Sequence, residues 1–351
     1  MWRTAIRLIP NHEEAVKPGP ENWFEQGFPT KNASIFPNIV NVEVFRGACP
    51  CNCVHCPVGI TPPADRAERF GRSGIDLGLY DKITKEVAAY DWSTVRMHSV
   101  GEPVLWPDLP EALAIGRRNG VRSWLFTCGV TTEGALLDQL CRDLAVLEVS
   151  VNSTGREDYL QTKGADLFDL ALDNLRRMSR HRKQGQCARL IVSRTQTTDA
   201  VADRAFVDHW KNSGLVDDAF VRSYHTYNGL MSGLDEGSAP GKHQPCLVHW
   251  ARFNISVQGQ AVVCFNELFR ESTSACLHHG DVRGQSIREI WQGPKLAALR
   301  RAELSGDYSG LPAADALPCR LCTSCQPLKG GRQTSEHQIR SLENPASCRA
   351  T

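Results

Sequence analysis

Three cysteines within eight residues are the side chains of this sequence best suited to chemistry. The stretch reads Cys49-Pro-Cys51-Asn-Cys53-Val-His-Cys56, and it follows a segment, 39–44, in which apolar and polar residues alternate as in a strand. We therefore expect Cys49, Cys53 and Cys56 to lie in a loop at the end of a strand, where three thiolates can converge on one inorganic centre. Three ligands are one fewer than a [4Fe–4S] cluster usually takes from protein, which leaves one iron open to another molecule.

A zinc site is the simpler interpretation of closely spaced cysteines. Zinc ligands usually come as C-x2-4-C pairs, however, and the spacing here is C-x3-C-x2-C. Cys51 lies between the three cysteines and is a possible substitute for one of them. The spacing favours an iron–sulfur cluster over zinc, and the resemblance described next implies Cys49, Cys53 and Cys56 as its ligands.

The C-x3-C-x2-C stretch resembles the motif of the radical S-adenosylmethionine (SAM) superfamily. The resemblance implies that the open iron is chelated by the amino and carboxylate groups of SAM, which is cleaved to methionine and a 5′-deoxyadenosyl radical that abstracts hydrogen. It also implies an electron donor such as flavodoxin or ferredoxin. One departure is His55, since the family often has an aromatic residue before its last cysteine.

Strand and helix patterns alternate between Val40 and Tyr227, which predicts an α/β fold with parallel strands and right-handed crossovers. The predicted strands are Val40–Phe45, Thr94–His98, Arg122–Phe126, Leu147–Val151, Leu190–Ser193 and Phe220–Ser223. The predicted helices are Leu79–Ala88, Leu109–Arg118, Thr132–Leu144, Leu167–His181 and Ala202–Ser213. Six such units fit the partial (β/α)6 TIM-like barrel that the resemblance implies, in which chemistry takes place at the C-terminal ends of the strands.

Polar residues at these strand ends are the candidate cosubstrate and substrate residues. The resemblance implies that Gly101 and Glu102 hold the amino group of SAM, and that Ser150 and Asn152 lie near its ribose and carboxylate. It places Arg194 as a partner of that carboxylate. Strand six ends in our candidates for substrate contact and proton transfer, Arg222, Ser223, Tyr224 and His225. The third strand ends in Cys128, where the family usually has asparagine.

A second group of cysteines follows a loop rich in glycine and polar residues, 231–241. Between Cys246 and Cys264 the sequence predicts a hairpin, Phe253–Val257 and Gln260–Val263, which brings these two cysteines together. An apolar helical pattern at 286–299 is interrupted at Gly293-Pro294. The chain then continues with the closely spaced cysteines Cys319, Cys322 and Cys325.

This half of the chain resembles the SPASM/twitch extension of radical SAM enzymes, a small C-terminal iron–sulfur domain. The resemblance implies one auxiliary [4Fe–4S] cluster with Cys246, Cys264, Cys319 and Cys322 as ligands, and Cys325 as the substitute. A tetrathiolate zinc site stays open, because cysteine spacing does not separate the two metals. We expect an irregular lead-in at 1–38, the barrel at 39–230, the auxiliary-cluster domain at 240–328 and a flexible tail at 329–351.

A cluster with four protein thiolates is suited to electron transfer, because none of its irons is open. The resemblance to twitch-type dehydrogenases implies oxidation of a hydroxyl-bearing carbon of a small sugar or aminocyclitol, as in antibiotic biosynthesis. The auxiliary cluster then accepts the electron, and His225 is the candidate general base.

Two other outcomes stay open. A thiol, with Cys128 the best placed, could return hydrogen from the opposite face and so epimerise the carbon. A ribosomal peptide is the alternative substrate, although the lead-in is too short for a separate peptide-binding domain. A non-catalytic electron carrier is less favoured because of the open-iron triad. We expect the remaining cysteines to pack as small hydrophobic residues, namely Cys51, Cys141, Cys187, Cys276 and Cys348.

The composition excludes several classes of protein. The chain has 351 residues, a formal net charge of +1 and 14 cysteines. Its charge gives no nucleic-acid footprint, and no apolar run is long enough to span a bilayer. The first ten residues lack the cleavage site of a signal peptide, and iron–sulfur clusters need a reducing compartment, so we expect a cytoplasmic protein.

Overall fold

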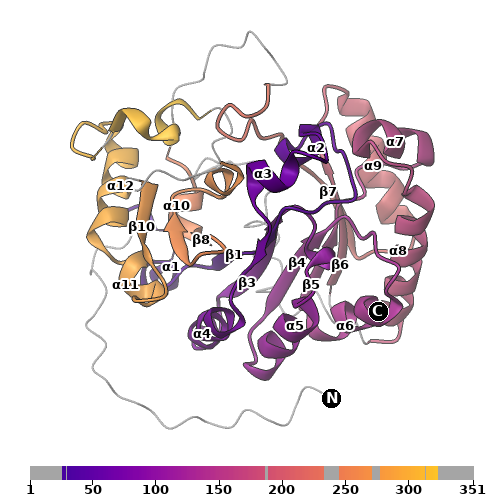
Figure 1. Cartoon of the computed structure of the whole chain (residues 1–351). Helices are drawn as coiled ribbons and strands as arrows, with labels where there is room; N and C mark the ends of the chain where they lie inside the picture. Colours follow the sequence, from indigo (N-terminus) through magenta and orange to yellow (C-terminus); the bar gives the residue numbers. More distant parts are fainter. Residues whose placement is uncertain are drawn as a thin grey trace.

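The computed structural model describes residues 26–28, 30–185, 189–232, 245–270, 277–312 and 314–322. Its strands form one sheet in the order β10-β9-β8-β1-β3-β4-β5-β6-β7, with β2 paired to β1. Helices cover the outside of the strands from β1 to β7, and β8–β10 continue the sheet beside β1 (Figure 1). The α/β class and the partial-barrel arrangement predicted from the sequence are confirmed.

The six predicted barrel strands are present and parallel to one another. Their bounds differ from the prediction by at most two residues at either end, as is usual for sequence-based boundaries. The strands are β1 Ile39–Arg46, β3 Thr94–Val100, β4 Ser123–Thr127, β5 Val146–Val149, β6 Arg189–Thr195 and β7 Asp218–Arg222.

The two faces of the barrel strands differ in polarity. In β1, the apolar residues Val40, Val42 and Val44 belong to the hydrophobic core, whereas Asn41 and Glu43 alternate with them and are also buried. Alternating residues of a strand point to opposite faces. One face therefore packs against the helices, and the other gives the interior of the barrel a polar lining.

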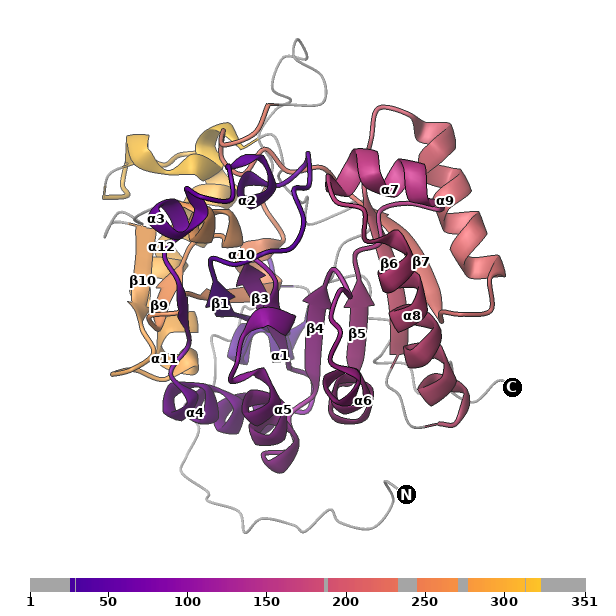
Figure 2. The ribbon, with the colours of Figure 1, turned by 45° about the vertical axis from the view of Figure 1, so that its right-hand side comes forward.

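The five predicted helices follow the strands and cover the outer face (Figure 2). Asp76 and Asp199 accept hydrogen bonds from backbone N–H groups at the starts of α4 and α9, as N-cap residues do. These helices are α4 Leu77–Ala88, α5 Leu109–Arg118, α6 Gly134–Asp143, α8 Phe168–Lys183 and α9 Ala200–Asn212.

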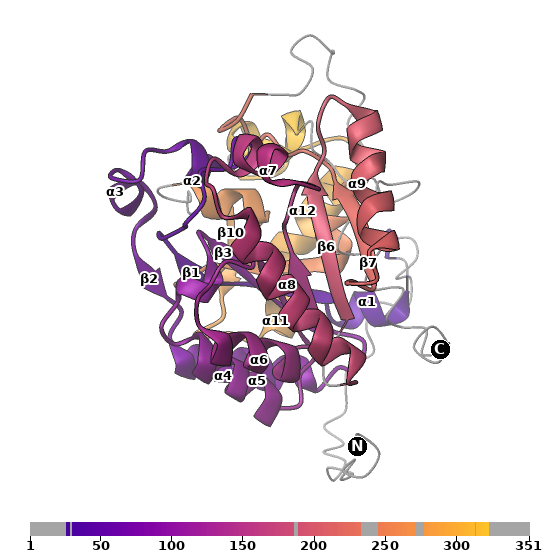
Figure 3. The same ribbon diagram turned by 90° about the vertical axis from the view of Figure 1, so that its right-hand side faces the viewer.

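Several short elements were not predicted from the sequence. The most consequential is α7, Arg156–Lys163, which packs against α8 on the side of the molecule that faces the viewer in Figure 3. The others are α1 Lys31–Ile35, α2 Pro57–Ile60, α3 Arg66–Phe70, β2 Ser73–Gly74 and the 3-10 helix η1 Pro103–Leu105.

The C-terminal segment contains the predicted hairpin of β8 and β9, which is antiparallel. β8 also pairs in parallel with β1, so this segment extends the barrel sheet. The predicted interruption of the helix at Gly293-Pro294 is confirmed, because α11 and α12 lie on either side of it. The elements are α10 Val248–Ala251, β8 Arg252–Ile255, β9 Gln260–Val262, η2 Phe265–Phe269, β10 His278–Asp281, α11 Ile287–Trp291, α12 Pro294–Ser305, η4 Ala314–Ala316 and η5 Pro318–Leu321.

The described helices include none with the length and apolar character needed to cross a bilayer. Of the cysteines expected to pack as hydrophobic residues, Cys141 is buried in the core on α6. Cys187, Cys276, Cys325 and Cys348 lie outside the described residues, as does the predicted tail at 329–351.

Candidate functional site

One cavity collects residues from the C-terminal ends of the barrel strands and from the C-terminal segment. Its lining includes Cys49, Cys53 and Cys56 of the first cysteine group. It also includes the second group as far as the structure describes it, Cys246, Cys264, Cys319 and Cys322. The two groups are far apart in the sequence, and the fold brings both to the same space.

The loop that carries the first cysteines is fastened to the end of β3. The backbone N–H of Gly47 donates to the carbonyl of Val100 (2.7 Å), and that of Glu102 donates to the carbonyl of Ala48 (2.8 Å). Gly101 has a φ of +138°, and a Cβ atom there would lie 2.5 Å from the oxygen of Ala48. Only glycine fits this close approach, which sets the position of Glu102 beside the cysteine loop.

The guanidinium of Arg66, a buried residue on α3, holds the same loop from the other side. It donates hydrogen bonds to the carbonyl oxygens of Cys49 (3.0 Å), Cys51 (3.2 Å), Thr61 (3.0 Å) and Gly59 (3.3 Å) and to the side-chain oxygen of Asn52 (2.5 Å). One planar group with five donors thus fixes the path of the chain between the cysteines. The sequence analysis did not identify Arg66.

Lys163, the last residue of α7, is a second functional candidate that the sequence analysis missed. Its backbone carbonyl accepts from the N–H of Asn52 (2.7 Å), and its buried ammonium donates to Ser150 Oγ (3.0 Å). Burial by itself lowers the pKa of Lys163, but the neighbouring thiols of Cys53 and Cys51 outweigh burial and raise it. The site therefore places a cation beside the first cysteine group, where thiolate charge would gather.

Cys51 and Cys128 are buried against the first cysteine group. The Cys51 thiol is in hydrogen-bond contact with Cys128, Cys49 and Cys53, and these contacts lower the pKa of Cys51. Cys51 thus faces the site and does not pack merely as a small hydrophobic residue. Cys128 lies at the end of β4, where its backbone N–H donates to Glu102 Oε2 (2.7 Å).

Glu102 is the only acidic residue among the described residues that line the cavity. Its carboxylate accepts hydrogen bonds from Thr127 Oγ1 (2.5 Å), from the N–H of Cys128 and from the N–H of Val104 (3.3 Å). Burial raises the pKa of Glu102, while the thiol of Cys128 and the hydroxyl of Thr127 oppose that shift. An oriented carboxylate next to the cysteine loop is suited to binding an ammonium group.

Ser150 and Asn152 both line the cavity, whereas Val151 does not, as their alternation predicts. Asn152 has a φ of +62°, and its side-chain oxygen accepts from the N–H of Thr195 (2.6 Å). The side-chain nitrogen of Asn152 donates to the carbonyl of Ser150 (3.4 Å). The end of β5 is thereby joined to the end of β6.

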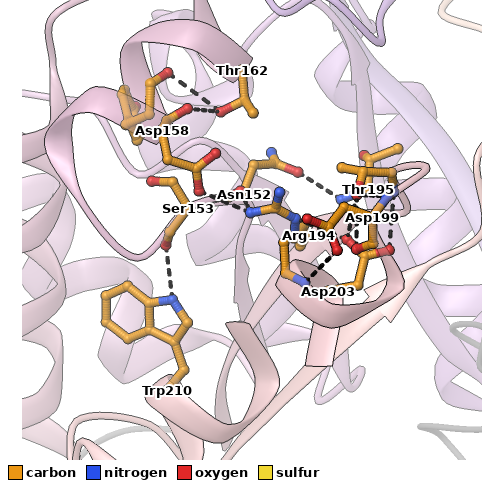
Figure 4. Close-up of polar contacts among 12 residues, drawn as sticks. Asn152, Ser153, Asp158, Thr162, Arg194, Thr195, Asp199, Asp203 and Trp210 are labelled. Carbon is orange, nitrogen blue, oxygen red and sulfur yellow. Dashed lines mark hydrogen bonds and ion pairs between the residues drawn. The ribbon is translucent and has the colours of Figure 1, made fainter. Parts of the chain in front are cut away.

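Arg194 is not where the sequence analysis expected it. Ser193 and Thr195 line the cavity, and Arg194 between them points to the other face of β6. Its guanidinium donates to Asp158 (2.9 Å), to Asp203 (3.0 Å) and to the carbonyl of Asn152 (2.7 Å), as Figure 4 shows. Arg194 joins α7 and α9 to the strand end, so the prediction that it contacts SAM is wrong in this structure.

The predicted substrate residues at the end of β7 differ in their surroundings. Arg222 lines the cavity and forms a two-pronged ion pair with Glu148, which is fully buried on β5. A guanidinium stays protonated, so Arg222 can orient a group but does not transfer a proton. His225 also lines the cavity, and its ring meets Phe265 edge-on with centroids 5.3 Å apart. Ser223 lines the cavity as well.

The second cysteine group offers four thiols to the cavity, those of Cys246, Cys264, Cys319 and Cys322. Burial raises the pKa of Cys264, and the nearby thiols of Cys246 and Cys322 add to the rise. These thiols therefore stay protonated unless a metal centre displaces their protons. Four sulfur donors that line one cavity are the ligand set of a [4Fe–4S] cluster. A zinc ion would need them closer together, since among the described residues no three of these thiols lie within 4.8 Å of one another.

His249 and Glu303 support this second group, and neither was identified from the sequence. His249 Nε2 lies 3.7 Å from Cys319 Sγ, and His249 Nδ1 lies 3.6 Å from Glu303 Oε1. Glu303 also accepts from the N–H of Cys246 (2.8 Å) and the hydroxyl of Tyr308 (2.9 Å). The carboxylate thus lies near one nitrogen of the imidazole, and the other nitrogen faces a cysteine sulfur.

Comparisons with known proteins agree with this picture. The SPASM family, an iron–sulfur cluster-binding domain, matches residues 246–326. A PqqA peptide cyclase from Granulibacter bethesdensis is 23% identical over 308 residues, which cover 78% of this chain and 76% of that protein.

Two solved structures align with this chain, and the first of them, SuiB, shares its fold. SuiB of Streptococcus suis, solved with its precursor peptide SuiA, aligns with a TM-score of 0.59 and 13% identity over 92% of this chain and 75% of SuiB. BtrN in complex with AdoMet and 2-DOIA aligns over 82% of this chain and 92% of BtrN at 17% identity, with a TM-score of 0.45. The chain thus carries a SPASM iron–sulfur cluster-binding domain over residues 246–326, and its cysteine motif and fold are similar to those of radical SAM enzymes that have such a domain.

Proposed function

We propose that this enzyme oxidises a carbon of a substrate held between its two cysteine groups. The observation that carries the proposal is the shared cavity, which both groups line. Hydrogen abstraction leaves a carbon radical, and a net two-electron oxidation requires an acceptor for the remaining electron. An auxiliary cluster at Cys246, Cys264, Cys319 and Cys322 would lie beside the same space.

The residues that line the cavity fit the cofactors of this superfamily. Cys49, Cys53 and Cys56 would hold the first [4Fe–4S] cluster, and Glu102 and Asn152 would bind the polar groups of SAM. When bound and reduced, by a donor such as flavodoxin or ferredoxin, the cluster and SAM supply a 5′-deoxyadenosyl radical. Lys163 balances the negative charge of the thiolates, and Ser150 accepts its hydrogen bond.

His225 is the proposed base. Oxidation of a carbon that carries a heteroatom with a proton, such as a hydroxyl group, also releases that proton. An imidazole nitrogen of His225 would take that proton. Phe265, which meets the His225 ring edge-on, gives this part of the cavity an apolar side. The paired Arg222 would orient the substrate without taking part in proton transfer.

Epimerisation through Cys128 has less support. A hydrogen donor has to lie across the substrate from the 5′-deoxyadenosyl radical. The Cys128 thiol contacts Cys51, and its N–H binds Glu102, so it lies on the side proposed for SAM. We expect a Cys128→Ala variant to form the same oxidised product as wild type. Epimerisation would be favoured instead if wild type formed an epimer and the variant either left the stereocentre unreacted or formed a ketone.

A peptide is the substrate class that the comparisons support best. The sequence relative described above is a PqqA peptide cyclase, and SuiB, which was solved with its precursor peptide, shares the fold. We therefore propose a peptide side chain as the first candidate. A hydroxyl-bearing sugar or aminocyclitol, as expected from the sequence, is the second candidate.

The test combines metal content with turnover. After anaerobic reconstitution, wild type should bind about eight irons per chain, and a Cys246/Cys264→Ala variant about four, since each cube holds four. The variant should still form 5′-deoxyadenosine with a reactive substrate but should give no oxidised product. Candidate precursor peptides and amino sugars would be compared by the 5′-deoxyadenosine that each elicits. Zinc in the second site, or oxidised product from the variant, would refute the proposed electron acceptor.

A further inference from the structure

We propose that the 3-10 helix η2, which begins directly after the candidate ligand Cys264, holds His225 in place through Asn228. A metal centre in the second cysteine group then positions the proposed base in addition to accepting an electron. The inference rests on the proposed function, because it assigns Asn228 and Glu267 as positioning residues for that base. Neither residue was a candidate in the sequence analysis.

His225 and Asn228 belong to a turn that follows β7. The turn closes on itself, because the N–H of Met231 donates to the carbonyl of Thr226 (3.0 Å). Tyr227 and Asn228 within it are left-handed, with φ angles of 50° and 56°. This conformation is unfavourable for a residue with a large side chain, and it persists where surrounding contacts enforce it. The turn therefore needs support from another element.

η2 and the residue that follows it give that support through polar contacts with Asn228. The side-chain amide of Asn228 donates to Glu267, whose side chain is fully buried. The amide of Asn266 donates to Asn228 Oδ1 (3.5 Å), and the guanidinium of Arg270 donates to the carbonyl of Asn228 (3.2 Å). Hydrogen bonds to a carboxylate are stronger than those between neutral groups, so Glu267 is the main anchor.

Aromatic contacts join the same two segments. The ring of Phe265 stands edge-on to that of His225, with centroids 5.3 Å apart, and both residues line the cavity. The ring of Phe269 stands edge-on to that of Tyr227, with centroids 4.7 Å apart. A shift of the first turn of η2 would therefore move the imidazole of His225 within the cavity.

Cys264 connects the start of η2 to the second cysteine group. It is the N-cap residue of η2, and its carbonyl accepts from the N–H of Glu267 (3.1 Å) while its sulfur accepts from the N–H of Asn266. A thiolate bound to a metal centre keeps this sulfur, and with it the first turn of η2, in one position. The other half of η2 is held by the barrel, since Arg46 donates to the carbonyl of Leu268 (2.7 Å). The metal centre thus controls the half of η2 that contacts the turn.

Hydrogen exchange measured by mass spectrometry tests this coupling without a substrate. In the anaerobically reconstituted enzyme, peptides that cover residues 223–231 are compared with peptides of β3, which serve as the internal reference. Asn228→Gly removes the side-chain contacts, and glycine tolerates the left-handed backbone. We expect exchange at 223–231 to become at least about tenfold faster in this variant, as the loss of one hydrogen bond to a carboxylate predicts, with about eight irons per chain retained.

Two variants of Glu267 separate the positioning contact from a general loss of stability. Glu267→Gln keeps an oxygen that can accept from Asn228, so exchange at 223–231 should stay within about threefold of wild type. Glu267→Ala removes the acceptor and should exchange as fast as Asn228→Gly. It replaces Asn228→Gly in the comparison if that variant unfolds or loses iron.

The Cys246/Cys264→Ala variant tests the link to the metal centre. Exchange at 223–231 should again be about tenfold faster than in wild type, with β3 unchanged. Unchanged exchange at 223–231 in this variant, or in an Asn228→Gly or Glu267→Ala variant that keeps its iron, would overturn the inference. So would an equal acceleration in β3, because the whole barrel would then have loosened.

The failure of this inference and that of the proposed function have different signatures. Unchanged exchange leaves the iron count and the oxidised product of wild type as proposed. Zinc in the second site would refute the electron acceptor, but a zinc ion bound to Cys264 would still hold η2, so the exchange results would stand.

Discussion

Replacement of Arg66 by alanine should release the first cysteine loop without removing any cysteine. Its guanidinium makes five hydrogen bonds to this region, and three of them reach the carbonyls of Cys49, Cys51 and Thr61 at 3.0–3.2 Å. A hydrogen bond from a charged donor contributes about 1.5–3 kcal/mol, and bonds from one group are not additive. We expect the free energy of unfolding to fall by about 3–5 kcal/mol.

The loss of these hydrogen bonds should reduce the amount of iron that the first cysteine group binds. The measurement is best made in the Cys246/Cys264→Ala background, where about four irons per chain belong to one cube. In that background Arg66→Ala should retain fewer than about two irons after anaerobic reconstitution and desalting. Arg66→Lys should give an intermediate value, because an ammonium group has three donors and lacks the planar fork.

Arg69→Ala is the matched control on the same helix. Arg69 makes one described hydrogen bond to this region, to Thr61 Oγ1 (3.1 Å), so its removal should cost about 1 kcal/mol or less and leave the iron count unchanged. If Arg66→Ala retained four irons and unfolded at the same temperature as Arg69→Ala, the guanidinium would not be what orders the loop.

Three further substitutions test other parts of the site. Glu102→Ala should weaken SAM binding at least tenfold, measured by equilibrium dialysis, with the iron count preserved; unchanged affinity would remove Glu102 from the SAM site. His249→Gln should lower the midpoint potential of the auxiliary cluster by about 50 mV in a redox titration, since one hydrogen bond to a ligand sulfur contributes about 1 kcal/mol; an unchanged potential would make His249 purely structural. Lys163→Met should lower the midpoint potential of the first cluster by on the order of 100 mV, because a buried cation is lost beside it; a rise would contradict the proposed charge balance.

Sequence reasoning reached the fold because the barrel strands carry a simple pattern. In β1, Val40, Val42 and Val44 alternate with polar residues. This period of two indicates a strand even when the neighbouring strands of the sheet are unknown. The motif of Cys49, Cys53 and Cys56 could be recognised as readily, because these residues lie close together in the sequence. The convergence of Cys246 with Cys264 followed from the hairpin between them. These features depend on neighbours in sequence, so they could be predicted.

The residues that hold the site together depend on tertiary contacts instead. Arg66 and Lys163 are an arginine and a lysine in short polar helices, a type that usually faces solvent, yet both are buried against the cysteine loop. His249 and Glu303 are 54 positions apart, and only the packing of α12 beside α10 brings them into contact. No local spacing indicates either pair.

The face of β6 that Arg194 occupies could have been predicted from the sequence. Alternation along β6 means that Ser193 and Thr195 share one face and Arg194 the other. A charge next to a strand end suggested a carboxylate partner, but the residue type alone does not say which face it occupies. In the structure Arg194 forms ion pairs with Asp158 of α7 and Asp203 of α9, and these ion pairs join both helices to the end of the strand. The same rule of alternation, applied to β3, places Arg96 and His98 on the face that looks into the barrel, where both line the cavity.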